Sequence, residues 1–539
     1  MAARPKADTA PTTMKQLKDT LWKAADKLRG SMDASQYKDV ILGLVFLKYV
    51  SDAFTERRVE LEGELREQGM TEAQAAQFLD DPDEYRGARV FWVPEVARWE
   101  FLAANAKGLE PADGGEPRSI GRLIDEAMDA VMVANPTLTG TLPRIFNRDN
   151  VDQRRLGELI DLFNAARFTG QGAARARDLL GEVYEYFLEK FAQAEGKRGG
   201  EFYTPAGVVR VLVELLEPTH GRVYDPACGS GGMFVQAEKF LEAHEREGSE
   251  ISVYGQELNE RTWRMAKMNL AIHGLGGNLA SRWGDTFARD LHPDLEADFV
   301  MANPPFNIKD WARNEADPRW RYGVPPAGNA NYAWIQHILS KLAPGGSAGV
   351  VMANGSMSSN SGGEGQIRAE LVEADLVSCM VALPTQLFRS TAIPVCVWFF
   401  ARDKSAGDRG SVDRTGQVLF LDARNLGHMV DRAERALSDD DIAKIANTFH
   451  AWRGTTSAVD AGLSYENEPG FAYSATLAEI QDAGYALTPG RYVGAAEVED
   501  DGEPIDEKIA RLTAELYEQF AESDRLAVVV REQLGRVDV

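Results

Sequence analysis

Beyond residue 200 the sequence alternates short apolar runs with stretches of helical periodicity, and this alternation limits the possible folds more than any other feature. Strands that alternate with helices build a mostly parallel sheet with helices on both faces. The runs at 377–383 and 395–401 are too close for a helical crossover, which predicts a late antiparallel strand. We therefore expect a doubly wound α/β sheet. The runs expected as strands are 222–225, 251–257, 281–285, 298–303, 347–353, 377–383, 395–401 and 418–421.

The regions on either side of this alternation have a different pattern. Apolar residues recur at helical spacing through much of 13–170, and a last helix carries a stripe of apolar side chains. That stripe comprises Ile505, Ile509, Leu512, Leu516 and Phe520. We expect a disordered leader at 1–12, an N-terminal helical domain at 13–170, a catalytic domain at 171–475 and a C-terminal segment with a docking helix at 476–539.

Composition restricts the compartment and the partners of this chain. The formal net charge is −24 over 539 residues, so the chain is not expected to supply most contacts to a long nucleic acid by itself. Its apolar runs are too short to span a membrane, and its first residues lack a secretion signal. Cys228, Cys379 and Cys396 are too few for a disulfide framework and are expected to be apolar fillers. A cytoplasmic protein without a metal site is the prediction.

A glycine-rich loop follows the first expected strand, which ends at Asp225. Glycines let a backbone turn tightly and approach a ligand closely. Phe234 stands where the third glycine of a dinucleotide fingerprint would be, and no phosphate-binding Gly-Lys-Ser/Thr sequence is present. The loop therefore predicts a nucleoside cofactor, although an ordinary strand-to-helix turn would have a similar composition. The residues expected to touch the cofactor here are Asp225, Gly229, Ser230, Gly231 and Gly232.

Two acidic residues and one short segment complete the expected cofactor site. Glu257 ends the second strand, where a carboxylate can accept both ribose hydroxyls. Asp285 ends the third expected strand and could accept the amine of an adenine ring. The segment before the first strand is expected to close over the other end of the cofactor, unless it is simply a helix cap with Pro205 in the first turn. It comprises Glu201, Phe202, Tyr203, Thr204 and Pro205.

The sequence Asn-Pro-Pro-Phe at the end of the fourth expected strand is the candidate catalytic loop. An exocyclic amine is a poor nucleophile because its lone pair is delocalised into the ring. The side-chain oxygen of Asn303 and the carbonyl of Pro304 could each accept a hydrogen bond from one of the two N–H groups of the amine, which would free that lone pair. Pro305 helps to fix the backbone, and Phe306 could stack on the base. A proline turn after a strand is the alternative.

The segment 307–334 interleaves cations with aromatic residues beside this loop. Such a combination favours phosphate contact and base stacking, and a solvated loop with buried aromatics is the alternative. The residues are Lys309, Arg313, Arg319, Arg321, Trp311, Trp320, Tyr322 and Tyr332.

With these motifs assembled, the chain resembles the modification (methyltransferase) subunits of type I restriction-modification systems. The N-terminal sequences 21–29 and 44–52 are similar to that family's helical domain. The loops at 200–205, 225–232 and 303–306 are similar to its cofactor and catalytic motifs, and 487–493 to the start of its C-terminal segment. The resemblance implies the methyltransferase variant of the doubly wound sheet, with methyl transfer from S-adenosylmethionine to the N6 amine of a flipped adenine in double-stranded DNA.

The resemblance also implies partners. Two modification subunits flank one DNA-specificity subunit, which reads the DNA sequence, and a restriction subunit adds cleavage. The acidic charge agrees with DNA recognition by a separate subunit, and the terminal apolar stripe offers a surface on which that subunit could dock. Two alternatives stay open at this point: a methyltransferase acting on a glutamine amide in protein, and a non-catalytic scaffold subunit.

Overall fold

The computed structural model describes residues 18, 21–23, 26, 34–110, 116–165, 181–191, 204–243, 251–388, 394–432, 434–495 and 505–534. The chain divides into two compact units, Met1–Val493 and Gly494–Val539. The first unit therefore extends past the boundary expected after residue 475. The expected leader at 1–12 lies outside the described residues.

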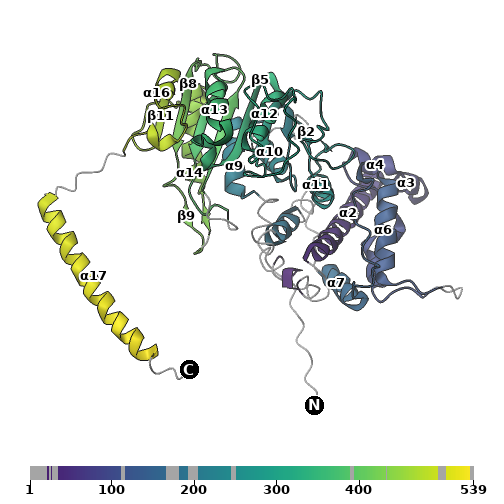
Figure 1. Ribbon diagram of the computed structural model, residues 1–539. Coiled ribbons are helices and arrows are strands. Elements are labelled where there is room, and N and C mark those ends of the chain that lie inside the picture. The colour runs from purple at the N-terminus through teal and green to yellow at the C-terminus, as the bar shows by residue number, and fades with distance from the viewer. Residues whose placement is uncertain are drawn as a thin grey trace. The chain divides into compact units, whose positions relative to one another are not determined.

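A central sheet organises the first unit (Figure 1). Its strand order is β11-β8-β6-β7-β5-β4-β1-β2-β3. β7 runs antiparallel to both of its neighbours, which confirms the expected late antiparallel strand, whereas β11 was not expected. The strands are β1 (Gly221–Asp225), β2 (Ile251–Gly255), β3 (Gly277–Asn278), β4 (Ala297–Ala302), β5 (Leu342–Ala353), β6 (Val377–Ala382), β7 (Val395–Ala401), β8 (Gln417–Asp422) and β11 (Ala472–Thr476). β9 (His428–Met429) and β10 (Arg435–Ala436) form a separate small pair.

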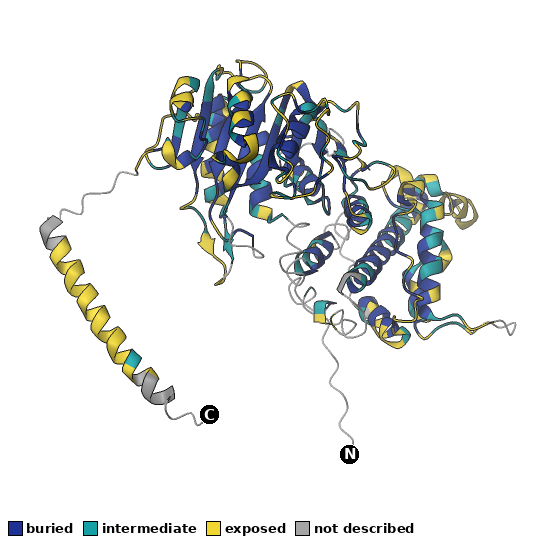
Figure 2. Ribbon diagram, in the orientation of Figure 1, coloured by how far each residue is buried: buried dark blue, intermediate teal, exposed yellow. Residues whose placement is uncertain are grey.

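Helices cover both faces of this sheet, because successive residues of each strand point to opposite sides. In β1, Val223 belongs to one apolar cluster and Tyr224 to the other, and Phe399 and Trp398 in β7 divide in the same way. Figure 2 shows the strands buried between the two layers. One layer contains α9 (Ala206–Leu216), α10 (Gly232–Ala243) and α14 (Asp439–Arg453); the other contains α12 (Asn331–Lys341), α13 (Glu364–Glu373) and α16 (Leu477–Asp482). The expected fold class is confirmed.

The expected strand at 281–285 is wrong. The third strand is the short β3, and the later segment makes its hydrogen bonds outside any ladder. Gly284 N–H donates to the Glu257 carbonyl at 2.8 Å, and the Gln256 side chain donates to the Gly284 carbonyl at 3.0 Å. One backbone bond and one side-chain bond thus join this segment to the end of β2, and no ladder forms.

An N-terminal helical part packs against one edge of this sheet domain. Its helices are α2 (Ala34–Glu67), α3 (Glu72–Leu79), α4 (Pro82–Gly87), α5 (Trp99–Ala104), α6 (Ile120–Ala134) and α7 (Gln153–Ala165). The helix at 181–191 also contributes apolar side chains to this core, as do Met265, Met268 and Ile272 of α11 (Glu260–Ile272). A buried hydrogen bond of 2.8 Å from the Tyr49 hydroxyl to the Ile272 carbonyl joins α2 to α11.

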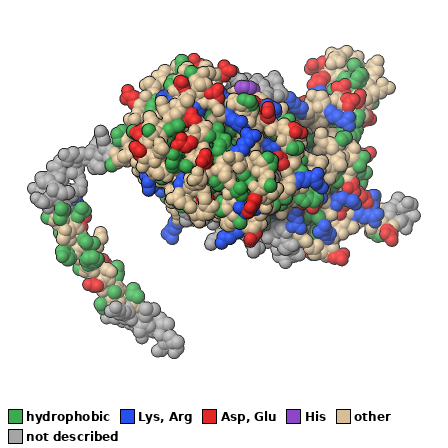
Figure 3. Space-filling view, turned by 45° about the horizontal axis from the view of Figure 1, so that its top comes forward, with side chains coloured by type: hydrophobic (Ala, Val, Ile, Leu, Met, Phe, Trp, Pro, Cys, Tyr) green, Lys and Arg blue, Asp and Glu red, His purple; other side chains and the backbone are tan. Residues whose placement is uncertain are grey.

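The second unit contains α17 (Ile505–Leu534), the expected terminal helix. Its described apolar side chains are exposed, with 56% for Ile509 and Phe520 and 48% for Leu512. Figure 3 shows hydrophobic side chains along its surface. Among the described helices of the chain, none has the length and apolar character needed to cross a lipid bilayer.

Replacing Tyr49 with Phe should lower the free energy of unfolding by about 1–3 kcal/mol, because the buried Ile272 carbonyl would lose its donor. Chemical denaturation followed by circular dichroism measures this change. Tyr517→Phe is the matched control, since Tyr517 is 68% exposed and its loss of a hydroxyl should change little. Equal midpoints for the two variants would show that the α2–α11 bond contributes nothing.

Candidate active site

The candidate site lies where the strand order reverses between β1 and β4. In open α/β sheets, ligands bind beyond the carboxyl ends of the strands at such a point. Asp225 ends β1 and Asn303 directly follows β4, so adjacent strands deliver both side chains to one pocket. Of the residues expected to bind cofactor or target, those that line it are Thr204, Asp225, Gly229, Ser230, Gly232 and Asn303.

The glycine loop makes a tight turn from β1 into α10. Gly231 N–H donates to the Cys228 carbonyl at 2.8 Å, and Gly231 has a φ of +77°, which favours glycine. A Cβ added at Gly231 would lie 3.6 Å from that of Ala266 on α11, whereas one at Gly232 would meet nothing within 4 Å. Gly231 therefore serves the turn and its packing on α11, while Gly232 keeps the pocket open.

Two buried carboxyl groups stand at the base of this loop. Asp225 accepts a hydrogen bond from Ala227 N–H at 2.9 Å, and Glu257 accepts from Gly229 N–H at 3.1 Å and Asn259 N–H at 2.8 Å. Burial raises the pKa of Asp225 to about 8, with Glu257 adding to the rise. Burial also raises the pKa of Glu257 to about 7, although backbone N–H groups oppose it. Hydroxyl donors from a ligand in the pocket would favour the ionised form of Asp225.

The two acidic residues expected at the second and third strand ends do not border the pocket. Glu257 lies behind Gly229, to which it is bonded. Asp285 does not end a strand, since β3 ends at Asn278, and its carboxylate accepts from Phe287 N–H at 2.8 Å and Ala288 N–H at 3.2 Å. One oxygen of Asp285 thus already serves the local turn, which weakens its assignment as an acceptor for an adenine amine.

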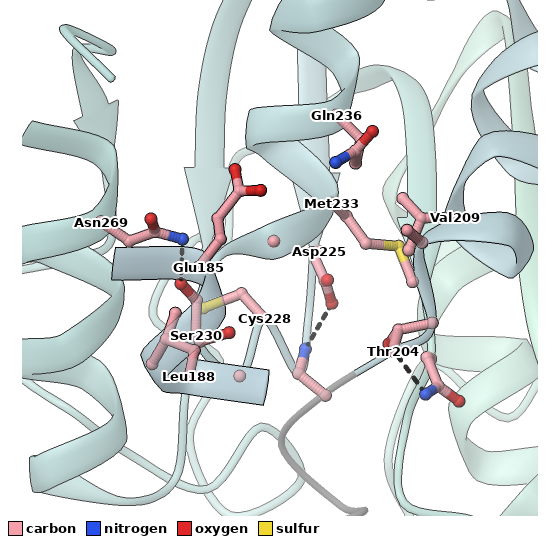
Figure 4. Close-up of a pocket in the computed structure, with 15 residues that line it drawn as sticks. Glu185, Leu188, Thr204, Val209, Asp225, Cys228, Ser230, Met233, Gln236 and Asn269 are labelled. Atoms are coloured by element: carbon pink, nitrogen blue, oxygen red, sulfur yellow. Dashed lines mark hydrogen bonds between the residues drawn. The ribbon is translucent and has the colours of Figure 1, made fainter. Parts of the chain in front are cut away.

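Asn303 presents an unused acceptor in the pocket. Its Nδ2 donates to Thr204 Oγ1 at 2.9 Å (Figure 4), which fixes the amide plane. Its Oδ1 is buried and has no hydrogen-bond partner among the described residues. A buried oxygen without a donor is costly, so this atom is suited to an N–H group brought in by a ligand.

Contacts with neighbouring residues outside the pocket fix the rest of the Asn-Pro-Pro-Phe loop. The Pro305 carbonyl accepts from Trp334 Nε1 at 3.1 Å, and half-buried Phe306 contacts the apolar clusters on both faces of the sheet. Asn307 has a φ of +59° and exchanges two bonds with Asn331, of 2.7 and 3.0 Å. These contacts preorganise the loop, and Pro304 within it is buried.

The segment before β1 is described only in part. Glu201, Phe202 and Tyr203 lie outside the described residues. Pro205 is the N-cap of α9, and the Thr204 side chain bonds Asn303 instead of capping the helix. The cap alternative therefore fails for Thr204, whose hydroxyl belongs to the pocket.

The pocket is also lined by three polar residues that the sequence analysis did not single out, Glu185, Gln236 and Asn269. Figure 4 shows Glu185 and Asn269 on one side of the pocket and Thr204 on the other, with Asp225 between them. Asn269 Nδ2 donates to the Ser230 carbonyl at 2.9 Å, and its Oδ1 is buried and unpartnered among the described residues. An Asn inside an amphipathic helix carries no local signal of such a role.

Glu185 connects the helical core to the pocket. It accepts from Lys239 Nζ at 2.8 Å and lies 3.3 Å from His273 Nε2. Burial alone would raise the pKa of Glu185, but the hydrogen bonds and charges of His273 and Lys239 together lower it to about 2. Glu185 is therefore a fixed negative charge at the rim of the site.

The cationic and aromatic segment after the loop is partly structural. Arg319 pairs with Asp317 at 2.5 Å and donates to the Thr286 and Phe287 carbonyls, and Trp311 and Trp320 are buried. These residues fix the segment against the 284–287 turn. The exposed residues Lys309 and Arg321 keep the expected role of phosphate contact as a prediction.

Cys228 lines the pocket, but it is not a nucleophile in this environment. Burial raises its pKa well above the usual thiol value, so it carries no thiolate at neutral pH. Within the described parts of the chain, no group of three or more His, Cys, Asp or Glu residues could hold a metal ion.

The strand order, with a glycine loop after β1 and an Asn-Pro-Pro-Phe loop after β4 beside one pocket, is the arrangement expected of a methyltransferase of amino groups. Comparison with known proteins specifies it further. The N-6 DNA Methylase family profile matches residues 175–501, and that of the HsdM N-terminal domain matches residues 17–163. The chain belongs to the N-6 DNA methylase family, as a methylase subunit of the type I restriction-modification kind, and is thus an adenine-specific DNA methyltransferase.

Individual relatives span almost the whole chain. The type I restriction enzyme HindI methylase subunit of Haemophilus influenzae is 48% identical over 454 residues, which cover 82% of this chain and 99% of that protein. The type I restriction enzyme MjaIX methylase subunit of Methanocaldococcus jannaschii is 39% identical over 536 residues, which cover 96% of this chain and 91% of that protein. The crystal structure of a type I methyltransferase subunit from Streptococcus thermophilus shares the fold, with a TM-score of 0.71, 24% identity, and coverage of 89% of this chain and 100% of that one.

The raised pKa of Glu257 predicts a pH-dependent stability of the empty protein. A carboxyl group whose pKa rises from 4.5 to about 7 on folding binds its proton more tightly in the folded state, so its contribution to stability falls as pH rises from about 4.5 to about 7. Glu257→Gln removes this dependence and should be more stable relative to the wild type at pH 8 than at pH 5. Denaturation midpoints at both values measure it, with the exposed Glu158→Gln as control. A difference independent of pH would contradict the burial argument.

Proposed function

We propose that this subunit transfers the methyl group of S-adenosylmethionine to the N6 amine of an adenine flipped out of double-stranded DNA, within a complex whose specificity subunit selects the sequence. The observation that carries the proposal is the unpartnered Oδ1 of Asn303 beside the pocket at the switch point. The family membership supplies the adenine and the type I context.

The residues present suit the cofactor. Asp225 is a buried acceptor for a hydroxyl group, Glu257 holds Gly229 from behind, and Gly232 leaves room for close approach of a ligand, since a Cβ there would meet nothing within 4 Å. Glu185 offers a fixed negative charge that would attract an ammonium group at the pocket rim. The bound cofactor supplies an electrophilic methyl group on a positively charged sulfur.

The target amine is activated by hydrogen bonding. Asn303 Oδ1 and the Pro304 carbonyl would each accept a hydrogen bond from one of the two N–H groups of the amine. The nitrogen lone pair is then less delocalised into the ring and points towards the methyl group. Phe306 would stack on the extruded base, since a base inside a duplex cannot reach such a loop. The Thr204 bond fixes the Asn303 amide, while the Asn307–Asn331 bonds and the Trp334–Pro305 bond hold the loop that carries Pro304, so the acceptors need little reorganisation.

Asn303→Ala should reduce methyl transfer by on the order of 10²-fold or more, because one activating acceptor is lost, while S-adenosylmethionine affinity stays nearly unchanged. Initial rates with the assembled complex and calorimetry on the purified chain measure the two quantities. Phe306→Ala should mainly raise KM for DNA. Asn164→Ala, at an exposed position of α7, is the control. A wild-type rate for Asn303→Ala would contradict the mechanism, and loss of cofactor binding would assign Asn303 to the cofactor instead.

The partner proposal rests on charge and on α17. In a chain of net charge −24, acidic residues outnumber the cations that could replace counterions on DNA, so we assign most of the sequence-specific DNA contacts to another subunit. Two copies of this subunit would flank one specificity subunit, and a restriction subunit would complete the nuclease. The exposed apolar side chains of α17 would be covered by helices of the specificity subunit.

Truncation after Val493 should leave a folded chain that binds S-adenosylmethionine but no longer co-purifies with the specificity subunit, because the first compact unit ends there. The double variant Leu512→Asp, Leu516→Asp in the full chain should have the same effect. Val133→Asp, at a position 84% exposed, is the matched control. Co-purification of the double variant at wild-type yield would place the docking surface elsewhere.

A further inference from the structure

A small apolar cluster lies apart from those on the two faces of the sheet and contacts both loops of the candidate site. Ala227 of the glycine loop and Ile308, just after the Asn-Pro-Pro-Phe loop, pack against it. In the described part of the chain, none of its buried members lines the candidate pocket, so it supports the two loops from outside. We call it the Phe287 cluster, and its buried members are Phe287, Trp311, Trp320, Ala330, Ala333 and Trp334.

On the side of the glycine loop, the connection is the turn that leads into Phe287. Thr286 is 4% exposed, and its hydroxyl donates to the carbonyl of Pro226, the residue directly after Asp225, at 2.7 Å. Arg319 donates to the carbonyls of Thr286 and Phe287, each at 2.9 Å. A shift of this turn would break bonds to both of its neighbours, so the glycine loop is held in place relative to the cluster.

On the side of the Asn-Pro-Pro-Phe loop, the connection is Trp334. Its ring centroid lies 4.3 Å from that of Phe287, and its Nε1 donates to the Pro305 carbonyl at 3.1 Å. The proline ring fixes the φ angle of Pro305, and the tryptophan bond fixes the carbonyl of that residue. Together they orient the preceding Pro304 carbonyl, which the proposed function uses as an acceptor for the target amine.

Arg319 also joins the cluster to β1 itself. Its charge is balanced by Asp317, whose carboxylate lies 2.5 Å from Nη2. Its Nη1 donates to Nδ1 of His337 at 3.0 Å, and Nε2 of His337 lies 3.1 Å from the hydroxyl of Tyr224 in β1. Burial, together with the charge of Arg319, lowers the pKa of His337 to about 3, so the imidazole is neutral and accepts this bond at physiological pH.

We propose that the Phe287 cluster sets the separation between the methyl donor and the target amine, with Thr286, Arg319 and Trp334 as positioning residues. The donor would lie on the glycine loop and the amine on the Asn-Pro-Pro-Phe loop, and the cluster is bonded to both. A misplacement of about 1 Å between reacting groups can reduce a rate by on the order of 10²-fold. This inference rests on the proposed function for the identity of the two ligands.

The test compares the rate of transfer with the two affinities. Thr286→Val and Trp334→Phe each remove one bond between the cluster and a loop while nearly keeping the shape of the side chain. We expect each to slow single-turnover methyl transfer by the assembled complex, on unmethylated host DNA, by about tenfold. Affinity for S-adenosylmethionine, measured by calorimetry, and KM for DNA should change by less than about twofold, because these side chains touch neither ligand.

The matched controls lose bonds of the same kind elsewhere in the chain. Thr55 donates to the Ser51 carbonyl at 2.9 Å, and Trp452 Nε1 donates to the Ser474 hydroxyl at 2.8 Å. Thr55→Val and Trp452→Phe should transfer methyl groups at the wild-type rate. Thr286→Ser keeps the hydroxyl and should restore most of the rate lost in Thr286→Val, and this pair decides if Trp334→Phe fails to fold.

The double variant Thr286→Val, Trp334→Phe tests whether the two bonds act through one cluster. If they do, the double variant should be little slower than either single variant, whereas independent effects would multiply to about a hundredfold. Multiplied effects, wild-type rates for both single variants, or a loss of cofactor affinity as large as the loss of rate would each overturn the positioning role. None of these results would affect the proposed function, which depends on the outcome for Asn303→Ala.

Discussion

The parallel pairing of β1 with β4 is the constraint on which the site depends. Val223 pairs with Phe299 and Tyr224 with Val300, so the carboxyl ends of two strands separated by more than seventy residues in sequence are fixed side by side. Asp225 is the last residue of β1 and Asn303 directly follows β4, so the pairing itself brings both side chains to the site. The rigidity of this pairing comes from the burial of both strands between two helical layers, which leaves the backbone no alternative partners.

The parts of the fold that could be predicted from sequence are those whose signal is local. Strand runs, the glycine turn and the Asn-Pro-Pro-Phe loop each carry their own residue pattern, and all but one of the expected strands are present. The failure at 281–285 has a specific cause, because periodicity cannot reveal that this segment is joined to the end of β2 by one backbone bond and by the Gln256 side chain, without a ladder. Arg319 shows the same limit for charge, since its ion pair with Asp317 and its carbonyl acceptors are set by packing.

Glu185 and Asn269 were missed for a related reason. Each sits on a helix whose sequence looks ordinary, and each reaches the pocket only through tertiary contact with a segment far away in the chain.

The two alternative functions, a protein glutamine methyltransferase and a non-catalytic scaffold, are disfavoured for different reasons. Family membership favours DNA over a protein glutamine, and the retained carboxylates, open glycine loop and unpartnered asparagine oxygen are unlike a scaffold that has lost its chemistry.

The helix at 181–191 gives the site a thermodynamic property of its own. It contributes Val183, Tyr184 and Phe187 to the core of the helical part, yet its Glu185 lines the candidate pocket. Any ligand whose affinity depends on that carboxylate must bind more tightly when the helical part is docked, and must in turn strengthen the docking by the same factor. Occupancy of the pocket and the packing of the helical part are therefore coupled through one side chain, and each would stabilise the other by the same free energy.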